Sequence, residues 1–280
     1  MRSRKPHSGH PSRVRVATLN LWSVGGAWNG RRKVLAEGFR ILQPDLIGFQ
    51  EAYKTADRDT VREIVDPEYH VVHQATGLIG DGNCAAIASR WPVKSVHELD
   101  QQLGERTADF PATTLFAEVD APEPIGPLLF VNHLPSWKPQ LEHERELQTV
   151  AAARRVEELV AERPAHVVLV GDLDAVPEAA SIRFLSGLQS LGGTSVFYRD
   201  AWEAAHPGES GHTFALRNPL MTEESDVVQE VGRRIDYVFV RAGDHGPSLE
   251  ISGCELLFAE PVNGVWASDH FGVVAELALP

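Results

Sequence analysis

The sequence predicts an α/β protein in which two packed β-sheets carry helices on their outer faces. Two observations support this fold class. Short strand-like runs recur along the chain, whereas only two long stretches have helical periodicity. A strictly alternating parallel fold would need a helix after almost every strand, so we expect two mixed sheets packed against each other.

The strands are predicted from short apolar runs that end at polar, Gly or Pro residues. Several of these runs end at an acidic, amide or imidazole side chain, which places polar groups at strand ends. The predicted strands are Val14–Leu21, Leu46–Phe49, His70–Gln74, Ala85–Ser89, Thr113–Val119, Leu128–Asn132, Val167–Val170, Ile235–Val240 and Phe271–Leu277.

Helices are predicted at about Arg31–Leu42 and Leu141–Ala161, and a shorter one at about Ala179–Leu188. The two long stretches place apolar side chains on one face. For the first helix these are Val34, Leu35, Phe39 and Leu42, and for the second Leu147, Val150, Ala151 and Val156. The segment Glu203–Gly232 contains Pro, Gly and acidic residues and is predicted to be a long surface loop.

The chain has 280 residues, of which 43% are hydrophobic and 23% charged, as in an ordinary globular protein. We expect residues 1–12 to be a disordered basic tail without the apolar core of a secretory signal, and residues 13–280 to form one domain. No apolar run approaches the roughly 18 residues of a transmembrane helix. Cys84 and Cys254 make no disulfide framework, so we expect buried thiols and a cytoplasmic location. We also expect a monomer.

The formal net charge is −13. Nonspecific DNA binding depends on Lys and Arg side chains that neutralise phosphates, and no basic stripe stands out in the sequence. Long duplex DNA is therefore disfavoured as a substrate. A local acidic cluster that binds a divalent cation remains compatible with a small phosphate ester.

Two polar residues end the first two strands. Asn20 follows Val14–Leu19 and is either a turn former or an amide that orients a phosphate or a metal-bound water. Glu51 follows Leu46–Gln50 and is either a solvated acid or a ligand for Mg²⁺, which takes only one or two protein carboxylates.

Two further strands end in candidate catalytic residues. His133 follows Leu128–Asn132 and is either a structural histidine or a proton donor. Asp172 and Asp174 follow four apolar residues and Gly171, and extended geometry would point both carboxylates the same way. Two adjacent ionised acids call for a cation or donors, unless they form only an acidic turn.

Asp236 stands in the apolar segment that follows Arg233 and Arg234. A buried acid needs a partner, so we expect either His270 or a plain salt bridge to one of these arginines. The triplet Ser268-Asp269-His270 precedes the last strand and can grip a phosphate.

Three further residues are candidates for substrate binding. Arg106 can hold a phosphate or form a surface salt bridge, and Trp137 can stack on a base or headgroup or pack over the next helix. His212 lies in the predicted long loop and is either a ligand contact or a loop residue without a role in the site.

Together these clusters resemble the endonuclease/exonuclease/phosphatase superfamily, which has the fold of deoxyribonuclease I. Six motifs occur in the order of that superfamily and cover about residues 13–279. They are Thr18-Leu19-Asn20, Gln50-Glu51, Asn132-His133-Leu134, Gly171-Asp172-Leu173-Asp174-Ala175, Arg234-Ile235-Asp236-Tyr237 and Ser268-Asp269-His270. The resemblance implies a four-layer α/β/β/α sandwich and a hydrolase of phosphate esters that uses Mg²⁺ or Mn²⁺.

The resemblance also implies roles for individual residues. Glu51 would bind the metal with Asn20 beside it and Asp269 nearby, and His133 would lie on the side of the leaving group. Asp172 would position or deprotonate the attacking water, while Asp236 would support His270 against the phosphate. The superfamily usually has Asn where this chain has Asp174, and we interpret Asp174 as an additional metal ligand.

We expect a phosphodiesterase or phosphatase that acts on a small molecule or a lipid headgroup. A metal-dependent nuclease on DNA or RNA is the first alternative, although the acidic net charge disfavours it. A catalytically silent binding module is the second, and the presence of Glu51, Asp172, Asp236 and His270 argues against it.

Overall fold

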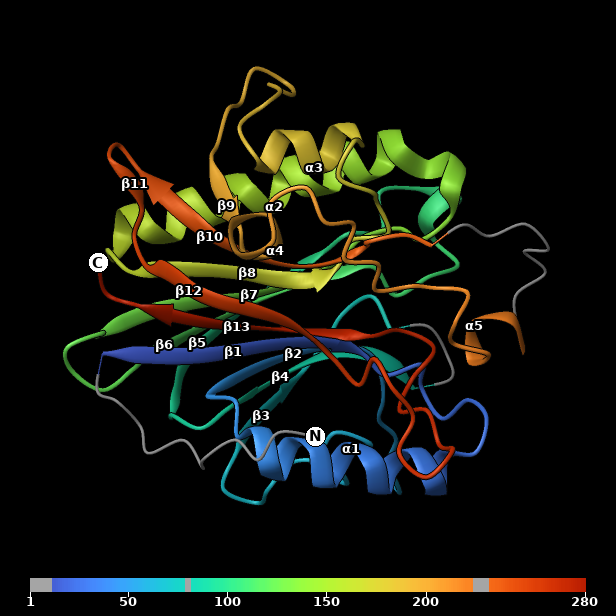
Figure 1. Ribbon diagram of the computed structural model, residues 1–280. Helices are drawn as coiled ribbons and strands as arrows, with labels where there is room; N and C mark the ends of the chain where they lie inside the picture. Colours follow the sequence, from blue (N-terminus) through green and yellow to red (C-terminus); the bar gives the residue numbers. More distant parts are fainter. Residues whose placement is uncertain (1–11, 79–81, 224–231) are drawn as a thin grey trace.

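Two β-sheets pack face to face in the computed structural model, which describes residues 12–78, 82–223 and 232–280 (Figure 1). The first sheet has the order β12-β13-β1-β2-β4-β3, and β1 and β2 are parallel neighbours. Its strands are β1 (Arg13–Asn20), β2 (Leu46–Tyr53), β3 (His70–His73), β4 (Asn83–Ser89), β12 (Glu250–Leu257) and β13 (Gly272–Ala278).

The second sheet has the order β11-β10-β8-β7-β6-β5, with β9 paired to β10. β7 and β8 run parallel, and the other neighbours are antiparallel. Its strands are β5 (Val93–Asp100), β6 (Thr113–Asp120), β7 (Pro127–Leu134), β8 (His166–Asp172), β9 (Tyr198–Asp200), β10 (Asp236–Gly243) and β11 (Gly246–Pro247).

Helices cover the outer face of each sheet. α1 (Trp28–Leu42) lies against the first sheet, whereas α2 (Glu142–Glu162) and α3 (Ala180–Leu185) lie against the second (Figure 1). The remaining helical segments are short: α4 (Ala201–Ala205), α5 (Leu220–Glu223), and the 3₁₀ turns η1 (Glu105–Thr107) and η2 (Pro139–Leu141). The layers are therefore α/β/β/α, as the sequence predicted.

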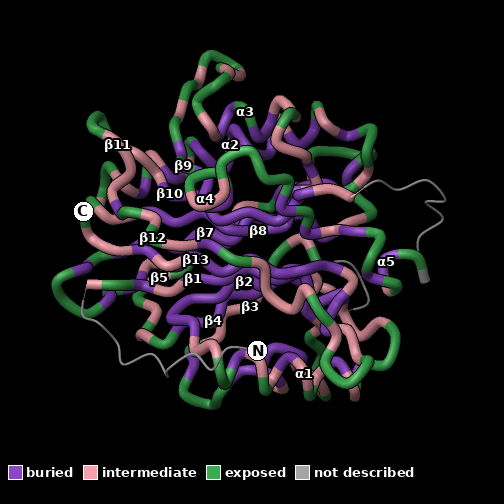
Figure 2. Tube along the Cα trace, viewed as in Figure 1, coloured by how far each residue is buried: buried purple, intermediate pink, exposed green. Residues whose placement is uncertain are grey.

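Three apolar clusters fill the spaces between these layers, and buried residues concentrate in the strands (Figure 2). The cluster between the sheets includes Val16 and Val168. α1 contributes Leu35 and Phe39 to the cluster on the first sheet. The cluster on the second sheet contains α2 residues such as Val156. Burial of these apolar surfaces is the main force that holds the layers together.

The inner face of α2 differs from the prediction. Val150 and Val156 are buried as expected, but Leu147 is 48% exposed and Ala151 is only half-buried. Polar side chains take the inward positions instead, because the helix also anchors neighbouring loops. Gln148, for example, is buried and its amide donates to the carbonyl of Gln101 and the hydroxyl of Ser136.

The described residues contain all the predicted strands and four further strands that were not predicted. β5 and β12 are long, half-buried strands at or near a sheet edge, where polar and apolar residues mix and the apolar signal is weak. β9 and β11 are only three and two residues long. The predicted loop at 203–232 contains the end of α4 and all of α5, whereas residues 224–231 lie outside the described ranges.

The strand directions bring the predicted site residues to one end of the sandwich. Asp236 begins β10 opposite Asp172, which ends the antiparallel strand β8. β13 likewise starts beside the end of β1. None of the described helices combines the length and the apolar character that a membrane crossing requires. The predicted basic tail lies almost wholly in residues 1–11, outside the described ranges.

Candidate active site

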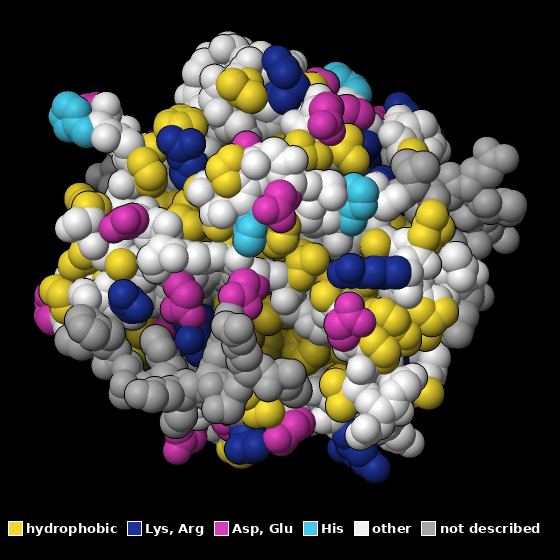
Figure 3. Space-filling model, viewed as in Figure 1, with side chains coloured by type: hydrophobic (Ala, Val, Ile, Leu, Met, Phe, Trp, Pro, Cys, Tyr) yellow, Lys and Arg dark blue, Asp and Glu magenta, His cyan; other side chains and the backbone are white. Residues whose placement is uncertain are grey.

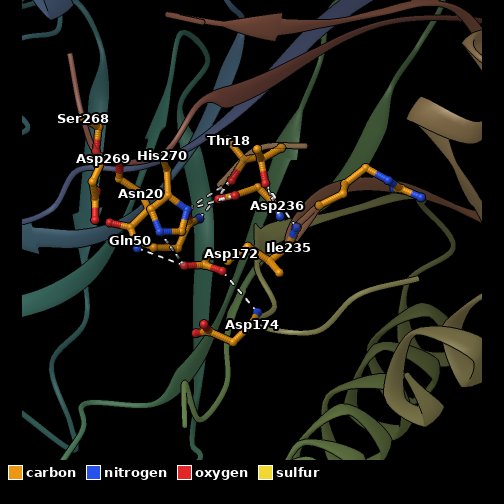
Figure 4. A network of polar contacts seen from close by, with 12 residues as sticks. Thr18, Asn20, Gln50, Asp172, Asp174, Ile235, Asp236, Ser268, Asp269 and His270 are labelled. Atoms are coloured by element: carbon orange, nitrogen blue, oxygen red, sulfur yellow. Dashed lines mark hydrogen bonds and ion pairs between the residues drawn. The ribbon is translucent and has the colours of Figure 1, made fainter. Parts of the chain in front are cut away.

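Polar side chains from both sheets converge where β1, β2 and β8 end and where β10 and β13 begin (Figure 4). His270 is the central residue of this cluster. Its Nδ1 donates to Oδ2 of Asp236 over 3.0 Å, and its Nε2 lies 3.8 Å from Oδ2 of Asp172. All three side chains are buried. The alternative of a salt bridge from Arg234 to Asp236 is wrong, because Arg234 donates to Asp200 over 2.6 Å.

The three carboxylates around His270 determine its charge. Burial alone would lower the pKa of His270, but the negative charges of Asp236, Asp172 and Asp269 outweigh that effect and raise the pKa well above its usual range. Asp236 is affected in turn: burial raises its pKa to about 6, although His270 opposes the rise. The pair therefore favours a protonated imidazole that can donate through Nε2.

Asn20 links two carboxylates of the cluster. Its Nδ2 donates to Oε1 of Glu51 over 3.0 Å and to Oδ2 of Asp172 over 2.9 Å. Its Oδ1 accepts from the backbone N–H of Trp22 over 2.8 Å, which fixes the orientation of the amide. Glu51 reaches this position because β2 has an irregular register between Phe49 and Ala52, and Glu51 itself has a φ of 48°.

Asp174 does not follow the extended geometry that would align it with Asp172. β8 ends at Asp172, and Asp174 lies in the left-handed region with a φ of 49°. Its backbone N–H donates to Oδ1 of Asp172 over 3.1 Å. Burial and the charge of Asp172 raise the pKa of Asp174 well above its usual range. The two acids are neighbours through a turn rather than along a strand.

Asp269 lies in the loop that precedes β13, and hydrogen bonds of Ser268 and Asn218 hold this loop in place. Ser268 Oγ donates to the carbonyl of Asn20 over 2.7 Å, and Oγ lies 3.1 Å from Oδ1 of Asp269. Asn218 Nδ2 donates to the carbonyls of Ser268 and Asp269 over 2.7 and 2.9 Å. The loop is thereby tied to β1 and to the segment before α5.

The acids of this cluster fit a divalent cation. Burial, with the charge of Asp269 second, raises the pKa of Glu51 to about 7, and burial also raises the pKa of Asp269. One ligand atom each from Asp172, Asp236 and His270 also lies within 4.8 Å of the others, but a protonated His270 has no lone pair to offer a metal ion. A raised pKa means that the ionised carboxylate is unfavourable in its buried surroundings. A cation bound by the carboxylate oxygens would stabilise the ionised form.

Two supporting residues were not predicted. Thr213 Oγ1 accepts from the backbone N–H groups of Ile235 and Asp236 over 3.1 and 3.2 Å, and its carbonyl accepts from Phe271 over 2.7 Å. Thr213 therefore joins the segments that carry Asp236 and His270. Asn218 is the second. Neither residue stands in a sequence motif, so nothing in the sequence distinguishes the two from other polar residues of this segment.

His133 lies on β7 and is completely buried. Its Nδ1 is 2.8 Å from Oγ1 of Thr114, and its Nε2 is 3.5 Å from Oγ1 of Thr149. Burial lowers the pKa of His133 to about 3, so the ring is neutral at ordinary pH. These contacts correspond to the structural alternative, and they do not join His133 to the Asp172–His270 cluster.

The candidates for substrate binding lie on the surface. Arg106 Nη1 is 2.7 Å from Oε1 of Glu144, which is the surface salt bridge expected as its alternative. Trp137 is 47% exposed, and Nζ of Lys138 lies 5.8 Å from the centre of its ring. His212 is exposed and lines a groove of about 360 Å³ together with Pro177, Glu209 and Arg233. Their part in substrate binding stays a prediction.

Comparison with known proteins identifies the family and the fold. Residues 17–270 match the model of the Endonuclease/Exonuclease/phosphatase family. A Drosophila melanogaster protein named putative neutral sphingomyelinase is 26% identical over 300 residues, which cover 95% of this chain and 61% of the relative. The chain thus spans less than two thirds of the length of that relative.

Solved structures share the fold at low sequence identity. TDP2 from C. elegans is 20% identical, with a TM-score of 0.74 over 95% of this chain and 75% of that chain. D. rerio TDP2 in complex with a single-strand DNA product is 18% identical, with a TM-score of 0.71 over 95% and 99% of the chains. A Bacteroides thetaiotaomicron endonuclease/exonuclease/phosphatase family protein is 18% identical, with a TM-score of 0.72 over 96% of both chains.

Proposed function

The chain belongs to the endonuclease/exonuclease/phosphatase family, and we propose that it is a divalent-metal-dependent phosphodiesterase for a small-molecule or lipid-headgroup ester. One observation carries the proposal: buried His270 lies between Asp236 and Asp172, beside the pair Asn20 and Glu51. The Drosophila relative is named for a sphingomyelinase, which supports a phosphodiester substrate.

Asp172 is the residue that orients and deprotonates the attacking water. Its Oδ2 accepts from Asn20 and its Oδ1 accepts from the backbone of Asp174, so the carboxylate is held in one orientation. A water near Asp172 can therefore be aligned for in-line attack on phosphorus, and positioning of this kind contributes most of the catalysis in phosphoryl transfer.

His270 stabilises the charge that develops on the phosphate. Asp236 holds Nδ1, which leaves Nε2 to donate to a phosphate oxygen. The 3.8 Å between Nε2 and Oδ2 of Asp172 is too long for a good hydrogen bond, so Nε2 has capacity for a substrate. A donor held in this way is worth more than one that must reorganise during the reaction.

Glu51 and Asp269 would hold the divalent cation, Mg²⁺ or Mn²⁺, beside Asp172. Asn20 would stand beside the cation and orient the carboxylates of Glu51 and Asp172 through its Nδ2. Carboxylate oxygens are ligands that such hard cations take. When bound, the cation neutralises charge on the phosphate oxygens. Asp174, where the family usually has Asn, adds a further carboxylate next to Asp172 and is proposed to contribute to the same negative potential.

The charge of the protein favours a small ester over a nucleic acid. The net charge is −13. On the face drawn in Figure 3, the described Lys and Arg side chains are scattered among Asp, Glu and apolar side chains rather than gathered in one stripe. A nuclease should lose affinity steeply as salt is added, whereas a hydrolase of a small ester should respond weakly.

The proposal is tested by hydrolysis of bis-p-nitrophenyl phosphate and p-nitrophenyl phosphate with Mg²⁺, Mn²⁺ or EDTA. We expect metal-dependent turnover of the diester that is lost in Glu51→Ala and His270→Ala. The matched controls Glu68→Ala and His70→Ala change exposed residues of the same types and should keep the activity. Turnover that persists in EDTA, or in either site variant, would contradict the proposal, and preference for the monoester would indicate a phosphatase.

A further inference from the structure

Arg31 is a cation buried directly behind the candidate site. It is 1% exposed and belongs to α1. Its Nε donates to the carbonyl of Ala267 over 3.0 Å, its Nη1 donates to the carbonyl of Gly25 over 2.6 Å, and its Nη2 donates to the carbonyl of Leu21. Burying a guanidinium is unfavourable unless its donors are satisfied, so three backbone carbonyls in this position form a built receptor for one side chain.

The three carbonyls belong to the loops that carry site residues. Leu21 follows Asn20, and Ala267 stands two residues before Asp269. The same loop after β1 is tied to the end of β2, because Leu21 N–H donates to the carbonyl of Gln50 and Ser23 N–H to that of Glu51, each over 2.8 Å. One side chain therefore connects the segments that position Asn20, Glu51 and Asp269.

The loop that Arg31 binds is conformationally strained. Trp22 and Ser23 have φ values of 51° and 46°, which residues other than Gly rarely adopt. The Trp22 ring lies against Gly25, where an added Cβ would be 2.7 Å from a ring atom. The guanidinium of Arg31 lies 4.9 Å from the centre of the same ring. Strain persists only where the surroundings impose it, and Arg31 is a contact that imposes it here.

Arg145 offers a matched comparison on the other side of the site. It is 4% exposed and donates to the carbonyls of Ser136, Lys138 and Pro139 over 3.0, 2.8 and 3.2 Å. Those carbonyls lie in the loop after β7, away from the segments that carry Asn20, Glu51 and Asp269. Arg145 therefore has similar burial and also donates to three backbone carbonyls, but it anchors a different loop and in addition pairs with Glu142 over 2.8 Å.

We infer that Arg31 is a positioning residue for cation binding: it holds the loops after β1 and before β13 so that Asn20, Glu51 and Asp269 keep the spacing of a divalent-metal site. The inference rests on the proposed function in assigning a divalent cation to these residues. It goes further in naming a residue that touches neither the cation nor the substrate.

The test is a titration of the full chain with Mn²⁺ in the absence of any substrate. Electron paramagnetic resonance measures the concentration of free Mn²⁺ at each step and so gives the Kd. For Arg31→Met we expect a Kd that rises by about 10- to 100-fold, the range seen when residues supporting metal ligands are replaced. Arg31→Lys should recover part of this loss, since one ammonium keeps the charge but cannot reach all three carbonyls. Arg145→Met should unfold at a lower temperature and yet bind Mn²⁺ within about twofold of the wild type, a change too small to indicate a lost ligand contact.

Each outcome separates the inference from the proposed function. If Arg31→Met binds Mn²⁺ as the wild type does, or if Arg145→Met loses as much affinity, the positioning role is wrong while the metal site stands. If the wild type binds no Mn²⁺, the cation itself is wrong, and the assignment of Arg31 to it is overturned as well. Should Arg31→Met fail to fold by circular dichroism, Arg31→Lys decides the question, and unchanged affinity in that folded variant would overturn the role.

Discussion

Asp236 accepts a hydrogen bond from Nδ1 of His270 over 3.0 Å, and both side chains are buried. Because the carboxylate occupies Nδ1, the imidazole presents Nε2 toward Asp172. Thr213 holds the backbone of Asp236, and its carbonyl binds the residue after His270, so the pair is fixed from both ends. The orientation of the imidazole is therefore set before any substrate arrives.

Replacement of Asp236 by Asn should impair catalysis much more than folding. An amide of the same size fills the position, but it neither stabilises a protonated imidazole nor selects the same tautomer. We expect kcat/KM for the diester to fall by about 10²- to 10³-fold, the usual range for loss of one preorganised donor to a developing charge. Steady-state kinetics with the wild type and Asp236→Asn at equal metal saturation measures this effect.

The pH profile of the same variant gives a second readout. Burial lowers the pKa of His270, while Asp236 leads the carboxylates that raise it. Without that carboxylate the pKa of His270 falls, so the protonated donor is lost at lower pH and the alkaline limb of kcat/KM shifts downward. An alkaline limb in the same place as in the wild type would show that Asp236 does not act through His270.

Metal binding should depend on pH through Glu51. Burial, and next the charge of Asp269, raises the pKa of Glu51 to about 7. A cation must displace the proton, so the apparent affinity for Mn²⁺ should fall by up to about 10-fold for each pH unit below about 7. Mn²⁺ titrations between about pH 6 and about pH 8 test this expectation.

The raised pKa of Glu51 also makes the stability of the metal-free protein depend on pH. An acid whose pKa is raised by folding destabilises the metal-free protein as pH rises through that pKa, and a bound cation offsets the loss. Stabilisation by Mn²⁺ should therefore be larger at about pH 8 than at about pH 6. Glu51→Gln removes the titrating group. If this variant binds Mn²⁺ weakly but its stabilisation by Mn²⁺ keeps the full pH dependence, another acid causes that dependence.

Much of the site could be predicted because a buried strand appears in the sequence as an apolar run, and the polar residue that follows the run marks the end of the strand. Asp172 follows an apolar run, and the cost of burying Asp236 required a partner, which is His270 in the structure. The relative placement of Asp172 and Asp174 could not be predicted, because the strand ends between them and Asp174 adopts a left-handed turn.

Residues that support the site left no comparable signal. Thr213 and Arg31 act on backbone groups that are distant in sequence, and these contacts exist only after the two sheets have packed. Leu147 was assigned inward from helical periodicity, yet α2 turns Arg145 and Gln148 inward because their polar groups anchor loops. Periodicity of apolar residues does not detect an inner face of that kind.

Gly171 should be intolerant of any side chain. A Cβ at this position would lie 1.9 Å from the backbone carbonyl oxygen of His133, and a strand backbone cannot yield as a flexible side chain would. We expect Gly171→Ala to lower the free energy of unfolding by about 3 kcal/mol, the upper part of the usual range for overpacking. Urea denaturation of the metal-free protein provides the measurement.

Gly243→Ala is the matched control for that substitution. Gly243 lies on β10, next to β8 in the sheet, and an added Cβ there meets nothing within 4 Å. Its effect should stay within about 0.5 kcal/mol, as for most surface substitutions. Equal destabilisation by the two variants would mean that the close approach of β7 to β8 does not determine the result.

Asp174→Asn should stabilise the metal-free protein, and increasingly so as pH rises. Burial and the charge of Asp172 raise the pKa of Asp174, so its ionisation disfavours the folded state above the pKa of the unfolded chain. Asn has the same shape, tolerates the left-handed φ of 49° and does not ionise. Thermal unfolding of both proteins in EDTA at about pH 5 and about pH 8 should give a larger difference at the higher pH. A constant difference would show that folding does not raise the pKa of Asp174 into this range. A less stable variant at about pH 8 would show that its carboxylate accepts hydrogen bonds that an amide cannot replace.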